Sequence, residues 1–161
     1  MAYETITRPS WKGRGIAIVA ANPREQESRL RAAVARRAYQ LFESEGCSPG
    51  HAGEDWRHAE TDLVRPLACG LLTRDDKVSV SADISVFDEG SVEVCVEPRR
   101  LSLCGRPRAQ NAENGACPLR EPVYRVLALP VEVDPRQVHA RFNGRILEID
   151  LYRTPLPALA A

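Results

Sequence analysis

Residues 92–105 have the sequence VEVCVEPRRLSLCG, and this stretch decides the fold of the C-terminal half of the chain. Every second residue at its start is a valine, and the residues between are glutamate or cysteine. After the turn signal Pro98-Arg99, leucine recurs with the same period at Leu101 and Leu103. A period of two places alternate side chains on opposite faces of a strand, so both runs predict half-buried β-strands.

The same alternation recurs on both sides of this stretch. Upstream it extends from Val78 to Ile84, and downstream it recurs around residues 124–129, 138–142 and 147–151. Turn signals separate the runs, and they are Asp88-Glu89-Gly90, Asp134-Pro135 and Asn143-Gly144. Short strands at this spacing, with no helical period between them, predict an antiparallel β-sandwich from about Val78 to Arg153.

The N-terminal half has a helical period instead. Asn22-Pro23 supplies a capping side chain followed by a proline at the first helical position. Apolar residues then recur at steps of three and four, at Leu30, Val34, Ala38, Leu41 and Phe42. Gly46 ends this helix. Trp56, Ala59 and Leu63, with Leu67 as a further candidate, mark a second helix that ends before Gly70. The two make a helical hairpin, with Trp56 as its expected packing anchor.

These patterns divide the chain into four segments. We expect a flexible arm over residues 1–21, a helical hairpin domain over 22–70, a β-sandwich over 71–153 and a tail over 154–161. The predicted fold class is therefore α+β by segments, with an α-helical hairpin followed by an all-β, immunoglobulin-like antiparallel sandwich. Within the arm, the apolar residues Ile16 to Val19 either add to a sheet edge or pack on the helices.

Composition excludes several classes of partner. The chain has 22 basic and 22 acidic residues, so no overall positive field attracts nucleic acid or anionic lipid. No apolar run approaches the roughly 20 residues that a membrane span requires. Five cysteines at irregular spacing argue against a disulfide framework and a zinc knuckle, and they favour a reducing cytoplasm.

An enzyme would need a nucleophile, a base or a metal site, and the sequence offers none with a recognisable spacing. His51 lies near Cys47, Glu54 and Asp55, but it follows Pro49-Gly50 and is expected to be a turn or helix-entry residue. The aspartates of the predicted strands lie far apart in the chain, so no paired-carboxylate site is recognisable. We therefore expect no catalytic residue, no metal and no cofactor.

Several separated blocks in the C-terminal half carry a resemblance to a known family. They are Ala82-Asp83-Ile84, Val96-Glu97-Pro98-Arg99-Arg100-Leu101-Ser102-Leu103-Cys104-Gly105, Tyr124-Arg125-Val126-Leu127-Ala128-Leu129-Pro130, Val133-Asp134, Val138-His139-Ala140-Arg141-Phe142-Asn143-Gly144 and Leu147-Glu148-Ile149. In order and spacing they resemble the α-crystallin domain of small heat-shock proteins. The resemblance implies an ATP-independent chaperone that binds non-native chains.

The helical hairpin resembles a bacterial domain of unknown function. The residues that carry this second resemblance are Arg36-Arg37-Ala38-Tyr39-Gln40-Leu41-Phe42, Gly46, Pro49-Gly50-His51, Glu54-Asp55-Trp56 and Ala59-Glu60. It brings no activity, and it suggests a bacterial origin.

The sequence departs from the family where assembly is concerned. Asn143-Gly144 lies one residue closer to Ala140 than in the family, and residues 106–121 form a polar loop without the strand that bacterial members exchange between partners. In the tail, Leu156 and Leu159 are three apart, in place of the family's isoleucine-x-isoleucine anchor. We therefore expect a homodimer or a monomer and no large shell.

The expected binding surface is a groove between the strand at residues 91–97 and the strand at 138–142. The residues predicted to line it or lie beneath it are Val92, Val94, Val138, Ala140 and Phe142. One face of each strand fills the core, and the sequence does not assign the faces. The ligands would be unfolded or partner proteins. A specific adaptor or co-chaperone without general holdase activity, and a stress-related scaffold, are the alternatives.

Overall fold

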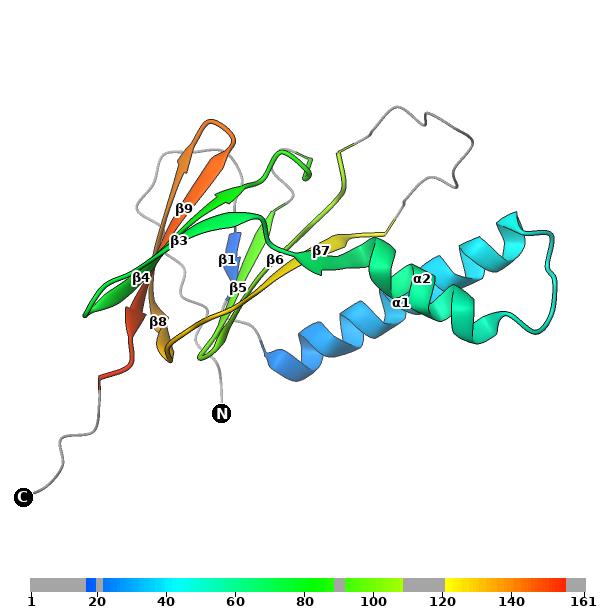
Figure 1. The fold of residues 1–161 in the computed structure, drawn as a ribbon, viewed down its shortest axis with the longest axis horizontal. Helices are drawn as coiled ribbons and strands as arrows, with labels where there is room; N and C mark the ends of the chain where they lie inside the picture. Colours follow the sequence, from blue (N-terminus) through cyan, green and yellow to red (C-terminus); the bar gives the residue numbers. More distant parts are fainter. Residues whose placement is uncertain (1–16, 20–21, 89–91, 109–120, 156–161) are drawn as a thin grey trace, which may run out of the picture.

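The computed structural model describes residues 17–19, 22–88, 92–108 and 121–155, and it consists of a helical hairpin beside a two-layered β-sandwich (Figure 1). In chain order the elements are β1 (Ala17–Val19), α1 (Pro23–Ser44), α2 (Ala52–Leu63), β2 (Val64–Pro66), β3 (Cys69–Thr73), β4 (Lys77–Asp83), β5 (Glu93–Glu97), β6 (Arg100–Gly105), β7 (Val123–Ala128), β8 (Val133–Asn143) and β9 (Ile146–Arg153). The predicted fold class is confirmed.

The sandwich consists of a five-stranded sheet and a four-stranded sheet. The first has the order β1-β5-β6-β7-β2, and the second has the order β3-β4-β9-β8. All strand pairs are antiparallel except the two outermost pairs of the first sheet, β1 with β5 and β2 with β7, which are parallel. The inner faces of both sheets form one apolar core, to which Val80, Leu103 and Ile149 each contribute a side chain that is at most 1% exposed.

Helix α1 begins and ends where the sequence predicts. The Asn22 side chain accepts a hydrogen bond of 3.1 Å from the Arg24 N–H, and Pro23 occupies the first turn. The helix ends at Ser44, and Gly46 then has a φ of +82°, the left-handed conformation that glycine adopts without strain.

Helix α2 is shorter than predicted, because it ends at Leu63 instead of continuing toward Gly70. The chain passes directly into β2, and Leu67 is a buried loop residue whose N–H donates to the Val126 carbonyl at 2.9 Å. Neither β2 nor β3 was predicted. The boundary that we drew between residues 70 and 71 falls inside β3.

The hairpin is held together by apolar side chains of both helices and by an ion pair, and Trp56 is only partly buried in it. The buried residues of α2 are Asp55, Ala59 and Leu63, which recur every four positions. Trp56 lies two helical turns before Leu63, on nearly the same side of α2, and it packs against the core, but it is only partly buried and not the fully buried anchor that the sequence predicts. Arg37 of α1 reaches Asp62 of α2 with a nitrogen–oxygen distance of 2.7 Å.

The N-terminal half of α1 is tied to the outer face of the five-stranded sheet by polar contacts. The Gln26 side chain donates to the Ser102 hydroxyl at 2.7 Å and accepts from the Cys95 thiol at 3.1 Å. Arg29 pairs with Glu93 on β5 at 3.1 Å. These contacts attach the hairpin to the sandwich.

Candidate functional site

The predicted groove corresponds to the side of the sandwich where β5 of one sheet and β8 of the other come into contact. Val92 and Val94 are 3% and 0% exposed, so both belong to the core and not to a surface. Val138 and Ala140 are partly buried and pack against that core. Phe142, at the end of the same row on β8, is 38% exposed. Exposure therefore increases along β8 toward Phe142.

The hairpin that joins β8 to β9 places two exposed apolar side chains on opposite faces of the sheet. Phe142 lies opposite Leu147, and Asn143 lies opposite Ile146. Ile146 is 40% exposed. Phe142 shares the core-facing side of the sheet with Leu147, whereas Ile146 lies on the outer face, so Phe142 is the exposed apolar side chain at this end of the groove.

The backbone edge of β5 is occupied by a segment from the same chain. Strand β1 runs parallel to β5, with Ala17 opposite Glu93, Ile18 opposite Val94 and Val19 opposite Cys95. The sequence left two alternatives for residues 16–19, and the structure places 17–19 at a sheet edge (Figure 1). Residue 16, like the rest of the arm, lies outside the described residues. The edge of β5 thus already pairs with a short extended segment, and such pairing is one way in which a sheet binds another chain.

The opposite edge of the same sheet is covered in the same way. Strand β2 runs parallel to β7, with Val64 opposite Tyr124 and Pro66 opposite Val126. Because β2 directly follows α2, the helical hairpin carries its own edge strand. Both edges of the five-stranded sheet are therefore occupied by segments of three residues.

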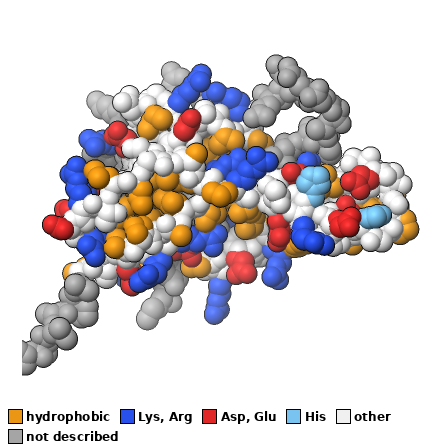
Figure 2. Space-filling view, in the orientation of Figure 1, with side chains coloured by type: hydrophobic (Ala, Val, Ile, Leu, Met, Phe, Trp, Pro, Cys, Tyr) orange, Lys and Arg blue, Asp and Glu red, His pale blue; other side chains and the backbone are white. Residues whose placement is uncertain are grey.

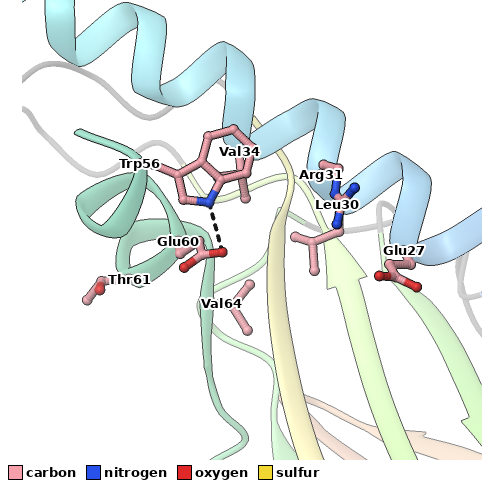
Figure 3. Close-up of a pocket in the computed structure, with 8 residues that line it drawn as sticks. All are labelled: Glu27, Leu30, Arg31, Val34, Trp56, Glu60, Thr61 and Val64. Atoms are coloured by element: carbon pink, nitrogen blue, oxygen red, sulfur yellow. Dashed lines mark hydrogen bonds between the residues drawn. The ribbon is translucent and has the colours of Figure 1, made fainter. Parts of the chain in front are cut away.

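A second concave surface lies between the two helices and is an open pocket of about 670 Å³ (Figure 3). Its lining combines aliphatic, aromatic and charged side chains, namely Glu27, Leu30, Arg31, Val34, Trp56, Glu60, Thr61 and Val64. The indole N–H of Trp56 donates to the Glu60 carboxylate at 3.0 Å. Sequence reasoning assigned Trp56 to the interior of the hairpin and missed this pocket.

The cysteines of the sandwich are poor nucleophiles in this environment. Burial raises the pKa of the Cys95 thiol to about 11, although a hydrogen bond with Ser102 opposes the change. Burial also raises the pKa of Cys104, against a hydrogen bond with Tyr124. A thiolate is the reactive form of cysteine, so both side chains act as core residues. Cys117 lies outside the described residues.

Polar residues on the outer face of the four-stranded sheet are paired with one another. Asp150 accepts hydrogen bonds from Ser79 at 2.6 Å and from Lys77 at 3.0 Å. Burial alone would raise the pKa of the Asp150 carboxyl, but these two donors and the Lys77 charge outweigh it and lower that pKa.

His51, at the start of α2, contacts Glu54 at 3.2 Å. Within the described ranges, no three His, Cys, Asp or Glu side chains are grouped to hold a metal ion.

The chain combines a hairpin of two helices with a two-sheet β-sandwich. Comparison with known families shows to which family a protein of this architecture belongs. The model of the Hsp20/alpha crystallin family matches residues 71–158, more than half of the chain, and the chain belongs to this family. The model of a second family, a protein of unknown function (DUF2934), matches residues 29–63 in the hairpin. Both resemblances inferred from the sequence are confirmed.

Solved structures of small heat-shock proteins are similar to the chain at low sequence identity. Heat shock protein 16.0 from Schizosaccharomyces pombe is 14% identical, with 60% of this chain and 73% of that chain covered and a TM-score of 0.44. HspA from Xanthomonas axonopodis is 21% identical, with 59% and 98% covered and a TM-score of 0.43. HSP18.5 from E. histolytica is 16% identical, with 60% and 96% covered and a TM-score of 0.44.

No curated protein matches the chain. Among the described residues, no helix is long and apolar enough to cross a membrane.

Proposed function

We propose that this protein is an ATP-independent chaperone that binds non-native proteins at the side of the sandwich formed by β5 and β8. The observation that carries the proposal is β1, a three-residue strand of the same chain that pairs in parallel with the edge of β5. A sheet edge that accepts one short extended segment can accept another. The client would take the place of β1.

The side chains beside this edge supply the apolar part of the binding surface. Val138, Ala140 and Phe142 form a row on β8 that is partly buried at one end and exposed at the other. A non-native chain exposes apolar residues in extended conformation, so it offers backbone groups to β5 and side chains to this row. Val92 and Val94 support the row from the core without touching the client.

We further propose that the protein acts without nucleic acid, membrane or cofactor. In this proposal it works in the cytoplasm as a homodimer or a monomer. Its tail residues Leu156 and Leu159 are spaced by three, so they cannot both enter adjacent pockets along an extended strand, where side chains on one face repeat every two residues. This spacing supports the absence of a large shell. The tail from residue 156 onward and the loop residues 109–120 lie outside the described residues.

The second candidate function is a specific adaptor, and the pocket in the hairpin favours it. That pocket combines the partly buried Trp56 with the carboxylates of Glu27 and Glu60. An aromatic side chain beside charges of fixed position is typical of recognition of one partner, not of many unrelated chains.

The two functions are separated by suppression of heat-induced aggregation of several unrelated proteins at near-stoichiometric ratio. A general chaperone protects several clients, and an adaptor protects none. Phe142→Asp should remove most of the protection without unfolding the sandwich, because the side chain is already 38% exposed. Tyr39→Asp on α1 is the matched control, since Tyr39 is 60% exposed and lies outside the groove. Full protection by the Phe142 variant would refute the groove.

A further inference from the structure

The pocket between the two helices has an apolar floor and a partly aromatic wall (Figure 3). Val34 on its floor is 2% exposed, and Leu30 and Val64 beside it are partly buried. The Trp56 indole N–H is already bonded to the Glu60 carboxylate at 3.0 Å, so only the apolar surface of this ring is left to contact a ligand. The volume of about 670 Å³ lies in the range of pockets that hold a small ligand, about 300–1,000 Å³.

The helix that forms one wall of this pocket is acidic. Helix α2 has four acidic residues and one arginine in its twelve residues, AGEDWRHAETDL. Figure 2 shows acidic side chains on the surface of the hairpin where Figure 1 places α2. On the other wall, Glu27 adds a carboxylate and Arg31 adds one cation. An occupant that is partly apolar and positively charged therefore fits the pocket.

Residues 8–14 of the same chain, RPSWKGR, have this chemistry, and we call them the basic segment. Three of the seven side chains are basic, namely Arg8, Lys12 and Arg14, and none is acidic. Trp11 is the largest apolar side chain of the arm that precedes β1. The basic segment lies outside the described residues.

The start of β1 lies close to the pocket. Ala17, where β1 begins, is opposite Glu93 of β5, and the Glu93 carboxylate pairs with Arg29 of α1 at 3.1 Å. Arg29 is followed by Leu30, which lines the pocket on the next flank of the same helix. The path round half of a helix about 10–12 Å wide is about 17 Å, whereas the chain from Trp11 to Ala17 can span about 20 Å. The basic segment can therefore reach the pocket, and its attachment gives it an effective concentration on the order of millimolar there.

We propose that the basic segment binds in the pocket of its own hairpin. Trp11 packs against the apolar floor. Arg14, which is nearer to β1, pairs with Glu27 on the wall formed by α1. Lys12 then pairs with Glu60 on the wall formed by α2. Neighbouring side chains of an extended segment point to opposite sides, so Trp11 enters the pocket while Lys12 keeps its charged end at the rim.

Docking of the basic segment would regulate both proposed binding surfaces. Because the arm continues directly into β1, its attachment to the hairpin holds β1 at the edge of β5. A partner protein that binds in the pocket displaces the basic segment and releases β1 at the same time. This regulation rests on the proposed client and adaptor functions, whereas the docking itself does not.

Photo-cross-linking in the full chain tests the docking. A benzophenone side chain in place of Trp11 should cross-link within one chain to peptides that contain Leu30 or Val34, as mass spectrometry would show. Lys12→Glu combined with Arg14→Glu should lower the yield of this cross-link by a factor of roughly five, because two attractions become repulsions. Both substitutions lie in the arm, outside the helices and the sandwich.

A second pair of reversals restores the charge complementarity. Glu27→Lys with Glu60→Lys, added to the reversed arm, should return the yield to near its original level. The matched control is Glu43→Lys with Glu45→Lys, which reverses two exposed carboxylates outside the pocket and should restore nothing. Circular dichroism verifies that each variant folds. If the pocket variants do not fold, the arm variants decide alone.

Three results would overturn the proposal: a cross-link to another part of the chain, a cross-link that forms only between two chains, or a yield that the arm reversal does not change. A cross-link to β5 or β8 would assign the basic segment to the client surface instead. The docking and the proposed function fail separately. A chain that shows the cross-link and protects no client keeps the docking, and a chain that protects clients without the cross-link keeps the chaperone function.

Discussion

Removal of residues 1–19 should increase client binding with little loss of stability. The deletion takes away β1 and leaves Asn22, which caps α1. Strand β1 pairs with β5 over three residues, and each backbone hydrogen bond contributes a net of about 1 kcal/mol. Ordering each residue costs about 1–2 kcal/mol. The two contributions nearly cancel, so the free energy of unfolding should change by less than about 2 kcal/mol.

Two measurements check this expectation on the same samples. Thermal unfolding should place the melting temperature of residues 20–161 within about 8 °C of the full chain, since 1 kcal/mol corresponds to about 2–4 °C at this size. Aggregation suppression should require a lower molar ratio of the shortened chain to client, because the β5 edge is no longer occupied. A peptide of residues 15–22, added in excess, should reverse the gain, and a scrambled peptide should not.

The reasoning is refuted if the shortened chain suppresses aggregation no better than the full chain. It is also refuted if the melting temperature falls by much more than about 8 °C, because β1 would then be an integral strand and not a displaceable one. A peptide that fails to compete would show that the gain arises elsewhere in the deleted arm.

Three further predictions concern stability and reactivity. Arg37→Ala removes one partner of a buried ion pair with Asp62 and should lower the free energy of unfolding in urea by about 3 kcal/mol. Asp150→Asn should be destabilising at pH 7. The carboxyl has a lowered pKa in the folded state, so it stabilises the fold above its unfolded pKa of about 3.9 and loses this effect as pH falls through the folded pKa, where the two melting curves should converge. Cys47 is exposed and should react with iodoacetamide at pH 8, whereas Cys95, with a pKa of about 11, should react only after unfolding, as mass spectrometry would show.

The strands that form the core could be predicted from the sequence because their buried residues repeat every two positions. In β4, β6 and β9 the apolar residues of the alternating pattern are buried in the structure, and Val80, Leu103 and Ile149 are examples. Helix α1 was predictable because a local signal, Asn22-Pro23, fixes its start.

The edge strands could not be predicted in the same way. A strand of three residues such as β2 is too short to show a period, and its partner in β7 lies about sixty residues further along the chain. The faces of β5 were also undecided, because the sequence does not say which face of the strand fills the core and which meets the groove. The structure assigns Val94 to the core, which reduces the exposed part of the predicted groove to the row on β8.

Strands β1 and β2 connect the helical hairpin to the two edges of the five-stranded sheet. Strand β1 directly precedes α1, and β2 directly follows α2, so the hairpin lies between the two strands that cover the edges of the five-stranded sheet. The contacts of Gln26 with Ser102 and Cys95 hold α1 on the outer face of that same sheet. A displacement of the hairpin would therefore pull on both covering strands at once. The other sheet, β3-β4-β9-β8, takes no strand from either end of the hairpin's covering pair, so such a displacement would expose the edges of β5 and β7 alone.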